Sequence, residues 1–187
     1  MKPELLQPEL LRKLLRYEPS TGKIFWKKRS ELFFENDGRS SAHRCSNWNS
    51  RYAETEAFTA KDRGGYFRGQ ILKKSYSLHR VAWALHYGKW PIGQIDHING
   101  NPEDNRILNL RDVSQTENAR NQKLHVDSST GYVGVTFRKL ANKWRAQIRA
   151  EGKNKHLGYF DNMNDAIDAR KSAETLHGYH KNHGRKS

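Results

Sequence analysis

Residues 94–118 place the strongest constraint on the fold, because short apolar runs alternate there with many turn-forming residues. The first run ends in Asp96 and His97 and leads into a polar loop rich in Asn. A second run covers residues 110–113, and a Ser-x-x-Glu capping box at residues 114–117 predicts that a helix begins there. The stretch therefore predicts a strand, a loop, a second strand and a helix.

Three side chains of this stretch fit the chemistry of phosphodiester hydrolysis. That reaction needs a base for the attacking water and charge neutralisation at phosphorus, which one hard cation supplies. Asp96 offers a carboxylate oxygen and Asn118 an amide oxygen, and Mg²⁺ needs only one or two such protein ligands beside water. His97, the next residue on an extended strand, points away from Asp96 and is available as the base.

Each of these residues also has a purely structural interpretation. Asp96 would then cap the loop, and Asn118 would be an ordinary polar residue of the first helical turns. The loop residues Asn99, Asn101 and Asn105 are interpreted as turn formers. Only the combination and its spacing favour a catalytic site.

The central segment, residues 76–122, resembles the HNH endonuclease family, in particular phage and intron-encoded homing-type nicking members in which Asn replaces the last His. The resemblance rests on Asp96-His97-Ile98-Asn99-Gly100, Asp104-Asn105-Arg106, Asn109-Leu110-Arg111 and Thr116-Glu117-Asn118. It implies a ββα-metal fold that cleaves DNA with one Mg²⁺ or Mn²⁺ per active site.

The same resemblance assigns a role to each site residue. Asp96 and Asn118 are expected to be the metal ligands and His97 the general base. Asn109 is expected to brace the loop and to orient His97. One active site per chain predicts that a monomer nicks one strand, so a double-strand break would need a dimer.

Composition excludes several kinds of site. The single cysteine, Cys45, rules out a disulfide within the chain and a structural zinc site built from cysteines. No run of about 18 apolar residues is present, so no membrane span is expected. The N-terminus lacks the apolar core of a signal peptide, and we expect an intracellular protein, with the phage resemblance implying the cytoplasm of a bacterial host.

The net charge of +14 is unevenly distributed along the chain. Residues 1–75 carry 16 Lys or Arg and 9 Asp or Glu, whereas residues 76–122 carry 5 of each. Residues 123–187 carry 13 basic and 6 acidic residues. Basic flanks favour contact with the phosphates of double-stranded DNA, and a neutral centre with several carboxylates suits a divalent cation.

Residues 1–75 predict a DNA-contacting region of one helix and a small antiparallel sheet. Leucines at helical spacing predict a helix over residues 8–17. Residues 23–27, 56–59 and 66–72 are predicted strands, residues 73–75 a turn, and residues 30–52 a long loop.

A further helix is predicted over residues 77–87, with Ser77 as its N-cap and Gly88 at its end. We interpret His79 in that helix as a core histidine in preference to a catalytic one.

The C-terminal segment, residues 131–187, predicts three strands and a helix, after a linker at residues 123–130. It resembles the Apetala-type, ethylene-response-factor-like DNA-binding domain, which also occurs appended to phage HNH nucleases. The resemblance rests on Gly134-Val135, on residues 143–149, on Leu157-Gly158-Tyr159-Phe160 and on an Ala-rich helix. In the second strand Trp144, Ala146 and Ile148 alternate with polar residues, which leaves a polar face available to the DNA major groove. The candidate DNA contacts on that face are Thr136, Arg138, Arg145, Gln147, Arg149 and His156.

We therefore predict an α+β protein of small modules, in which a central ββα-metal motif is followed by a three-stranded antiparallel sheet packed on one helix. The predicted activity is that of a metal-dependent DNA endonuclease. A DNA-binding regulator with an inactive nuclease module is the main alternative. An RNA-binding protein is less favoured, because the polar face lacks the aromatic stacking positions typical of RNA-binding sheets.

Overall fold

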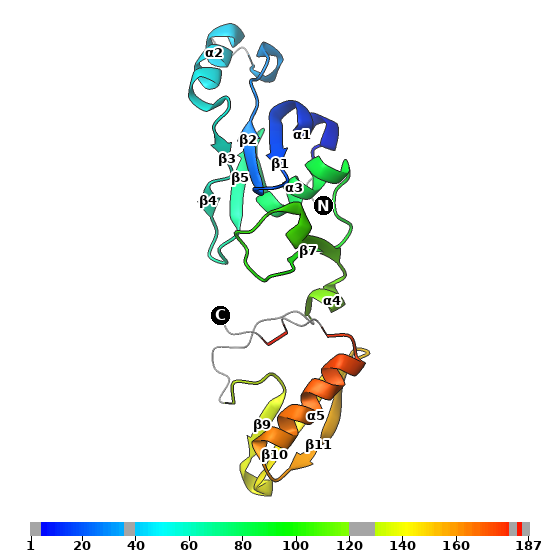
Figure 1. Cartoon of the computed structure of the whole chain (residues 1–187). Helices are drawn as coiled ribbons and strands as arrows, with labels where there is room; N and C mark the ends of the chain where they lie inside the picture. Colours follow the sequence, from blue (N-terminus) through cyan, green and yellow to red (C-terminus); the bar gives the residue numbers. More distant parts are fainter. Residues whose placement is uncertain (1–4, 36–39, 120–129, 180–182, 185–187) are drawn as a thin grey trace. The chain divides into compact units, whose positions relative to one another are not determined.

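The computed structural model describes residues 5–35, 40–119, 130–179 and 183–184. The chain divides into two compact units, Met1–Val113 and Ser114–Ser187 (Figure 1). Apart from Thr130, the predicted linker at residues 123–130 lies outside the described residues. Each unit has its own hydrophobic core.

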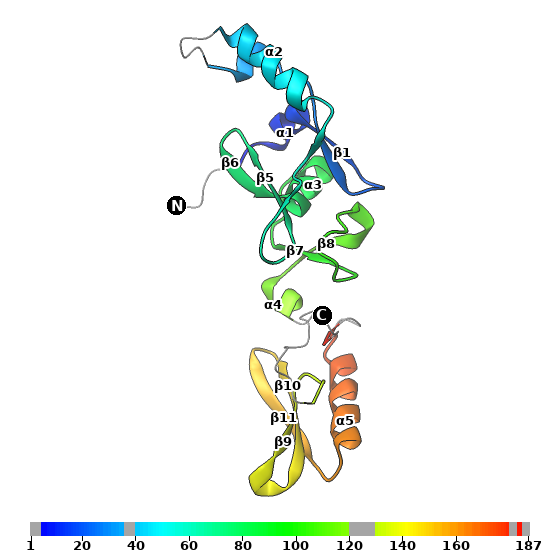
Figure 2. The ribbon, with the colours of Figure 1, turned by 90° about the vertical axis from the view of Figure 1, so that its left-hand side faces the viewer.

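The first unit contains three small antiparallel sheets around a central helix (Figures 1 and 2). One sheet has the order β1-β2-β3, formed by Leu15–Glu18, Lys23–Trp26 and Glu56–Ala57. A second has the order β4-β5-β6, formed by Ala60–Lys61, Phe67–Ile71 and Lys74–Ser77. The third pairs β7 with β8, formed by Gln94–His97 and Leu110–Val113. The helical elements are α1 (Pro8–Leu14), η1 (Glu31–Phe33), α2 (Ser41–Tyr52), α3 (Leu78–Tyr87) and η2 (Ile107–Asn109).

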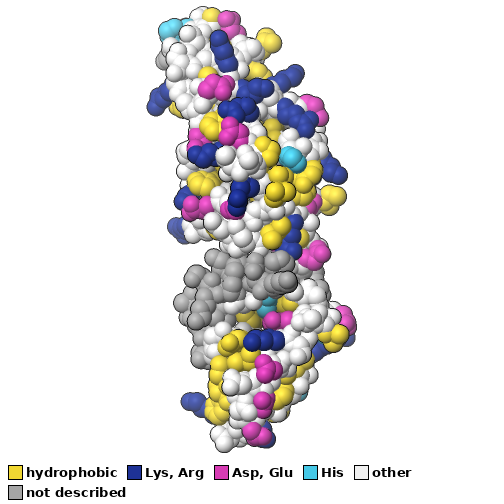
Figure 3. All heavy atoms as spheres, in the orientation of Figure 1, with side chains coloured by type: hydrophobic (Ala, Val, Ile, Leu, Met, Phe, Trp, Pro, Cys, Tyr) yellow, Lys and Arg dark blue, Asp and Glu magenta, His cyan; other side chains and the backbone are white. Residues whose placement is uncertain are grey.

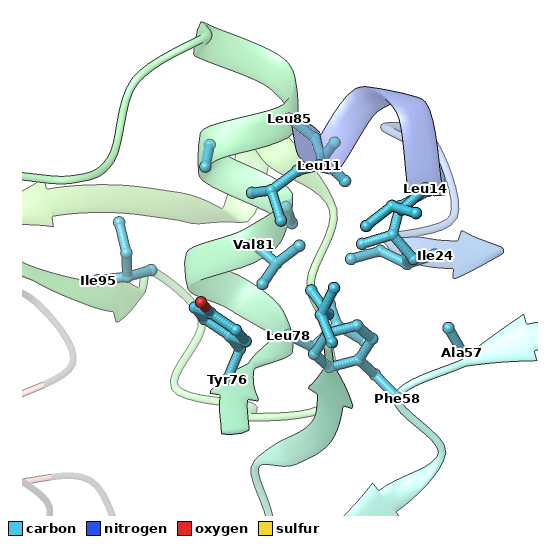
Figure 4. Packing of buried hydrophobic residues seen from close by; sticks show 14 of the residues in the cluster. Leu11, Leu14, Ile24, Ala57, Phe58, Tyr76, Leu78, Val81, Leu85 and Ile95 are labelled. Atoms are coloured by element: carbon cyan, nitrogen blue, oxygen red, sulfur yellow. The ribbon is translucent and has the colours of Figure 1, made fainter. Parts of the chain in front are cut away.

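Helix α3 lies at the centre of the first core, as its sequence predicts. It begins after Ser77 and ends at Gly88, whose left-handed backbone (φ 69°) closes the last turn. Val81 is fully buried and packs among side chains from α1, β2 and β5–β6 (Figure 4). The cluster also includes Ile95 and Leu110 from the β7–β8 pair. Residues 1–75 and the nuclease segment therefore share one core, and their separate functional roles stay a proposal.

Two local predictions in the first unit are wrong. The helix over residues 8–17 ends at Leu14, because Leu15 adopts an extended backbone and starts β1 opposite Trp26. Of the predicted turn at residues 73–75, Lys74 and Ser75 belong to β6, and the chain reverses one residue earlier, at Leu72 and Lys73, which both have positive φ.

The predicted loop over residues 30–52 is the largest error, because it contains η1 and the 12-residue helix α2. The Oγ of Ser40 accepts a hydrogen bond from the backbone N–H of His43 (3.2 Å), which caps the helix. Trp48 packs edge-on against Trp26 (ring centroids 5.7 Å apart). The helix is held by aromatic rings, so the aliphatic periodicity that reveals α1 and α3 is missing from it.

The second unit is a three-stranded antiparallel sheet packed on one helix. After the short helix α4 (Gln115–Ala119), the strands β9 (Val135–Arg138), β10 (Lys143–Ala150) and β11 (Lys153–Phe160) form a sheet of order β11-β10-β9. A turn of 3-10 helix, η3 (Lys139–Ala141), joins β9 to β10, and α5 (Met163–Leu176) follows the sheet. The core between sheet and helix consists of Val135, Ala146, Ala166 and Ile167. The predicted α+β class is confirmed.

The alternation predicted for β10 is also present. Ala146, Ile148 and Ala150 are buried on the α5 side, whereas Arg149 is exposed. Arg170 of α5 is 4 % exposed, and it donates hydrogen bonds to the backbone oxygen of Gln147 (2.7 Å) and to Glu174 (2.8 Å). This arginine therefore ties the helix to the middle strand. In the part of the chain that the structure describes, no helix has the length and apolarity needed to span a membrane.

Candidate active site and nucleic-acid interface

Strand β7 directs Asp96 and His97 into different surroundings. Asp96 lies opposite Arg111 in the β7–β8 register. The Nε and Nη2 atoms of Arg111 both donate to Asp96 Oδ2, at 2.8 and 2.6 Å. Since the Asp96 residue is only 8 % exposed, this charge-assisted pair holds its carboxylate in one orientation.

His97 is held by Asn105. The Nε2 of His97 lies 3.2 Å from Asn105 Oδ1, and both residues are buried, at 4 and 2 % exposure. The Asn105 amide nitrogen donates to the backbone oxygen of Glu103 (3.0 Å). Because that carbonyl can only accept, Oδ1 must face His97, and Nε2 therefore carries the hydrogen that it donates. In the neutral ring the basic lone pair is then on Nδ1.

Two aromatic rings lie beside His97. The ring centroid of Tyr66 is 5.7 Å from that of His97, and the ring of His79 is edge-on at 5.4 Å. Burial lowers the pKa of His97 and lowers that of His79 to about 3, so both rings are neutral at pH 7. His79 Nδ1 is buried without a hydrogen-bond partner within the described chain. The neighbours of the His97 ring therefore include two aromatic rings and the side-chain amide of Asn105.

Asn109 braces the loop that follows β7. Its Oδ1 accepts from the backbone N–H of Asn99 (2.9 Å), and its Nδ2 donates to the backbone oxygen of Asp104 (2.7 Å). The expected bracing contact is therefore present. The side chain that hydrogen-bonds His97 is Asn105, so Asn109 acts on the ring only through the loop.

Further contacts hold residues 104–106 of the same loop. Asp104 pairs with Arg106 (2.6 Å), and this hydrogen-bonded guanidinium lowers the pKa of Asp104 to about 2. The hydroxyl of Tyr17 in β1 donates to the backbone oxygen of Asn105 (2.7 Å). Gly22, in the β1–β2 turn, lies against the backbone of residues 105–106. The N-terminal hairpin therefore supports the loop that carries Asn105.

The predicted capping box is present at the start of α4. The N–H of Glu117 donates to Ser114 Oγ (3.2 Å), and the N–H of Ser114 donates to Glu117 Oε2 (2.8 Å). Asn118 lies in this helix, where its N–H donates to Ser114 O (3.0 Å). Since α4 belongs to the second unit and Asp96 to the first, their shared cation stays a prediction.

Carboxylate and amide oxygens, the groups of the two predicted ligands, suit an oxygen-preferring cation better than a soft one. Among the described residues, no group of three His, Cys, Asp or Glu side chains is arranged to hold a metal. Mg²⁺ keeps several water ligands, so one carboxylate and one amide oxygen are enough protein ligands to bind it. Asp96 and Asn118 therefore remain suitable ligands by their chemistry.

The polar face of the second unit brings together the side chains expected there. Arg145 pairs with Thr136 on one side and with Tyr159 on the other. Gln147 pairs with His156, and a bulge follows Ala146 in the β10–β11 register. Arg145 Nη2 donates to Gln147 Oε1, which links two candidate contacts on one strand. Arg138 and Arg149 are exposed.

Tyr159 belongs to this face although it was not among the predicted DNA contacts. It is 51 % exposed and its ring lies 4.8 Å from that of His156. The face therefore does carry an exposed aromatic side chain, contrary to the sequence-based expectation. Alternation along β11 is broken by the bulge, and that break hides Tyr159 from a simple period-two pattern.

Sequence reasoning also missed three residues around the site. Asn105 looked like one more turn former, and Arg111 had no assigned role. His79 was interpreted as a core residue, yet its ring faces His97. A signal existed for Asn105, since it follows Asp104 within a recognised motif. The partner of Arg111 depends on strand register, which the loop length leaves open.

Comparison with known proteins places these features in a family. The sequence profile described as HNH endonuclease matches residues 76–120, which contain Asp96, His97, Asn105 and Asn109. Protein 3.8 of Escherichia phage T7 is 32 % identical over 101 residues, covering 54 % of this chain and 84 % of the phage protein. The profile match ends before β9, so the Apetala-type resemblance of the second unit stays a prediction.

A solved structure described as "DNA binding and cleavage by the HNH homing endonuclease I-HmuI" also resembles the chain. Its TM-score is 0.41 at 21 % identity, over 93 % of this chain and 92 % of that one. The chain therefore belongs to the protein family that includes phage T7 protein 3.8, and its residues 76–120 form an HNH endonuclease domain.

Proposed function

We propose that this protein is a metal-dependent DNA endonuclease in which His97 is the general base. The observation that carries the proposal is the fixed orientation of the His97 ring. Its Nε2 is bound to Asn105 (3.2 Å), which leaves Nδ1 as the atom that accepts a proton. A neutral imidazole with a single free lone pair is suited to remove a proton from water.

The metal ligands are proposed to be Asp96 and Asn118. Arg111 holds the Asp96 carboxylate in place, and a cation at Asp96 would share or replace that contact. A bound Mg²⁺ or Mn²⁺ would neutralise charge on the scissile phosphate and assist departure of the 3′-oxygen. Asn109 would keep the loop folded while His97 accepts the proton.

The second unit is proposed to bind double-stranded DNA through Thr136, Arg138, Arg145, Gln147, Arg149 and His156. The net basic charge of the chain supports this role. A single site per chain predicts that a monomer nicks one strand, and a break in both strands would need two copies. We expect the protein to act in the cytoplasm of a bacterial host.

One observation favours a DNA-binding regulator as the second candidate. Asp96 is buried and already pairs with Arg111, whose side chain is 31 % exposed, and separating the pair would take away the positive charge beside this buried carboxylate. If that pair persists in the presence of metal, the site would be inactive and DNA binding would remain.

Cleavage of supercoiled plasmid DNA separates the two candidates. The wild type should convert plasmid to the nicked form with Mg²⁺ and lose this activity with a chelator. His97→Ala should cleave at least about 10²-fold more slowly and should bind DNA as the wild type does. Binding without any cleavage by the wild type would favour the regulator, and equal cleavage by His97→Ala would remove the proposed base.

A further inference from the structure

Helix α2 (Ser41–Tyr52) is attached to the first unit along one side only. In both ribbon views it lies at one end of the unit, beyond the β1-β2-β3 sheet (Figures 1 and 2). Within the described chain, its main helical neighbour is the short η1 turn. A helix in this position adds little to the central core, so its exposed side is available for another role.

On its attached side, α2 is held by several contacts to a single residue, Arg29. Asn49 Oδ1 accepts from the backbone N–H of Arg29 (2.8 Å), and Asn49 Nδ2 donates to the backbone oxygen of Arg29 (2.9 Å). The Arg29 guanidinium lies 3.8 Å from the ring centroid of Trp48. The buried Cys45 Sγ contacts the same Arg29 oxygen (3.2 Å). These contacts fix the helix axis relative to β2.

The opposite side of α2 is exposed and largely polar, and the helix itself contributes no carboxylate to it. Six exposed residues recur at helical spacing and form what we name the outer face, consisting of Ala42, His43, Ser46, Asn47, Ser50 and Arg51. The whole helix contains no Asp or Glu. The outer face therefore carries one cation, Arg51, together with hydroxyl, amide and imidazole groups and no negative charge of its own.

The chemistry of this face matches the edges of DNA bases. Asn pairs with adenine and Arg with guanine in the major groove, and Ser contacts either base. An α-helix is roughly 10–12 Å wide, and the major groove is about 12 Å wide. Lys and Arg side chains spread over the visible surface of the unit supply the charge that attracts phosphates (Figure 3). One edge of the outer face, at Ser46 and Ser50, lines a hollow that is also bordered by Lys28 and Glu31, one cation and one carboxylate.

We propose that α2 is a DNA-reading helix whose outer face enters the major groove of the target duplex. This inference rests on the proposed function, because it takes double-stranded DNA as the substrate. Asn47 and Arg51 make the base contacts, while Asn49 and Trp48 hold the helix at a fixed angle. The protein then reads its site with two separate elements, α2 and the sheet of the second unit.

The test uses the full-length chain with a chelator, so that binding is measured without cleavage. The wild type is first used to select duplexes from a random double-stranded library. Binding to the selected duplex and to a scrambled duplex is then compared for wild type, Asn47→Ala and Arg51→Ala. Lys13→Ala serves as the control, because Lys13 is an exposed cation on α1 of the same unit.

Each α2 variant should bind the selected duplex about 10-fold more weakly and the scrambled duplex nearly as well as the wild type. Lys13→Ala should change both affinities equally and by little. Unchanged binding by both α2 variants, or equal losses on both duplexes, overturns base reading by α2 while leaving the endonuclease proposal intact. If the wild type binds no duplex DNA at all, both proposals fail. Far-ultraviolet circular dichroism of each variant confirms that α2 still folds.

Discussion

The two central residues of the candidate site are each held in place by a side chain from elsewhere in the chain. His97 and Asp96 are neighbours in the chain, yet one is fixed by Asn105 and the other by Arg111. Asn105 is the more informative of these partners, because its amide orientation decides which ring nitrogen carries the hydrogen. The proposed reaction therefore depends on a side chain that touches no substrate.

Replacing Asn105 tests this dependence. Asn105→Leu removes the acceptor for Nε2, and the rate constant kcat for plasmid nicking should fall by roughly 10- to 100-fold with KM for DNA little changed. Asn105→Asp keeps an acceptor oxygen and should recover a large part of the rate. Equal loss in both variants, at equal thermal stability, would assign Asn105 to folding and not to orientation of His97.

Small elements of the first unit support one another at points of close backbone contact. The β1–β2 hairpin holds the 98–109 loop through Tyr17 of β1, and Ile107 N–H donates to the backbone oxygen of Pro19 in the turn (3.3 Å). Gly22 in this turn has a φ of +78°, and a Cβ there would lie 2.6 Å from the backbone nitrogen of Arg106. Both the conformation and the contact therefore require glycine.

Gly22→Ala should weaken both the fold and the reaction. Displacing residues 105–106 costs about 1–3 kcal/mol, and the midpoint of thermal unfolding should fall by roughly 4 °C or more. Nicking should fall as well, since Asn105 moves with this backbone. Gly152→Ala is the matched control, because it has a φ of +77° with no atom within 4 Å of the added Cβ. Similar effects in both variants would show that backbone strain alone is responsible.

The whole molecule combines an HNH domain with basic flanking regions on either side in sequence. Residues 1–75 and 123–187 hold most of the Lys and Arg, whereas the central segment is balanced in charge. Binding that depends on phosphate contacts weakens as salt rises, because condensed counterions are released from DNA. Changes to the basic flanks should therefore alter the affinity for DNA without altering the rate of hydrolysis.

The sheet of the second unit offers the corresponding test. Replacing both Arg145 and Arg149 with Ala should lower DNA affinity and reduce the slope of log K against log salt by up to about 0.9 per lost phosphate contact. Nicking at saturating DNA should stay near the wild-type rate. Lys171→Ala on α5 is the control, since α5 packs on the opposite side of the sheet. An unchanged salt slope in the double variant would exclude this face from DNA binding.

The sequence by itself determined the features that arise from neighbours in the chain. The capping box of Ser114 and Glu117, the end of α3 at Gly88 and the alternation along β10 are local, so residue type and spacing are sufficient to predict them. The α+β class follows from the same local patterns. The four short motifs between Asp96 and Asn118, in matching order and spacing, were likewise enough to indicate an HNH domain.

Only the tertiary structure decided which distant groups meet. Arg111 reaches Asp96 through the β7–β8 register, and Tyr17 reaches Asn105 across 88 positions of the chain. Helix α2 was missed because edge-on packing of Trp48 against Trp26 replaces the aliphatic stripe that marks most buried helix faces. Such contacts join segments that are far apart in the sequence, and no local pattern specifies which segments pair.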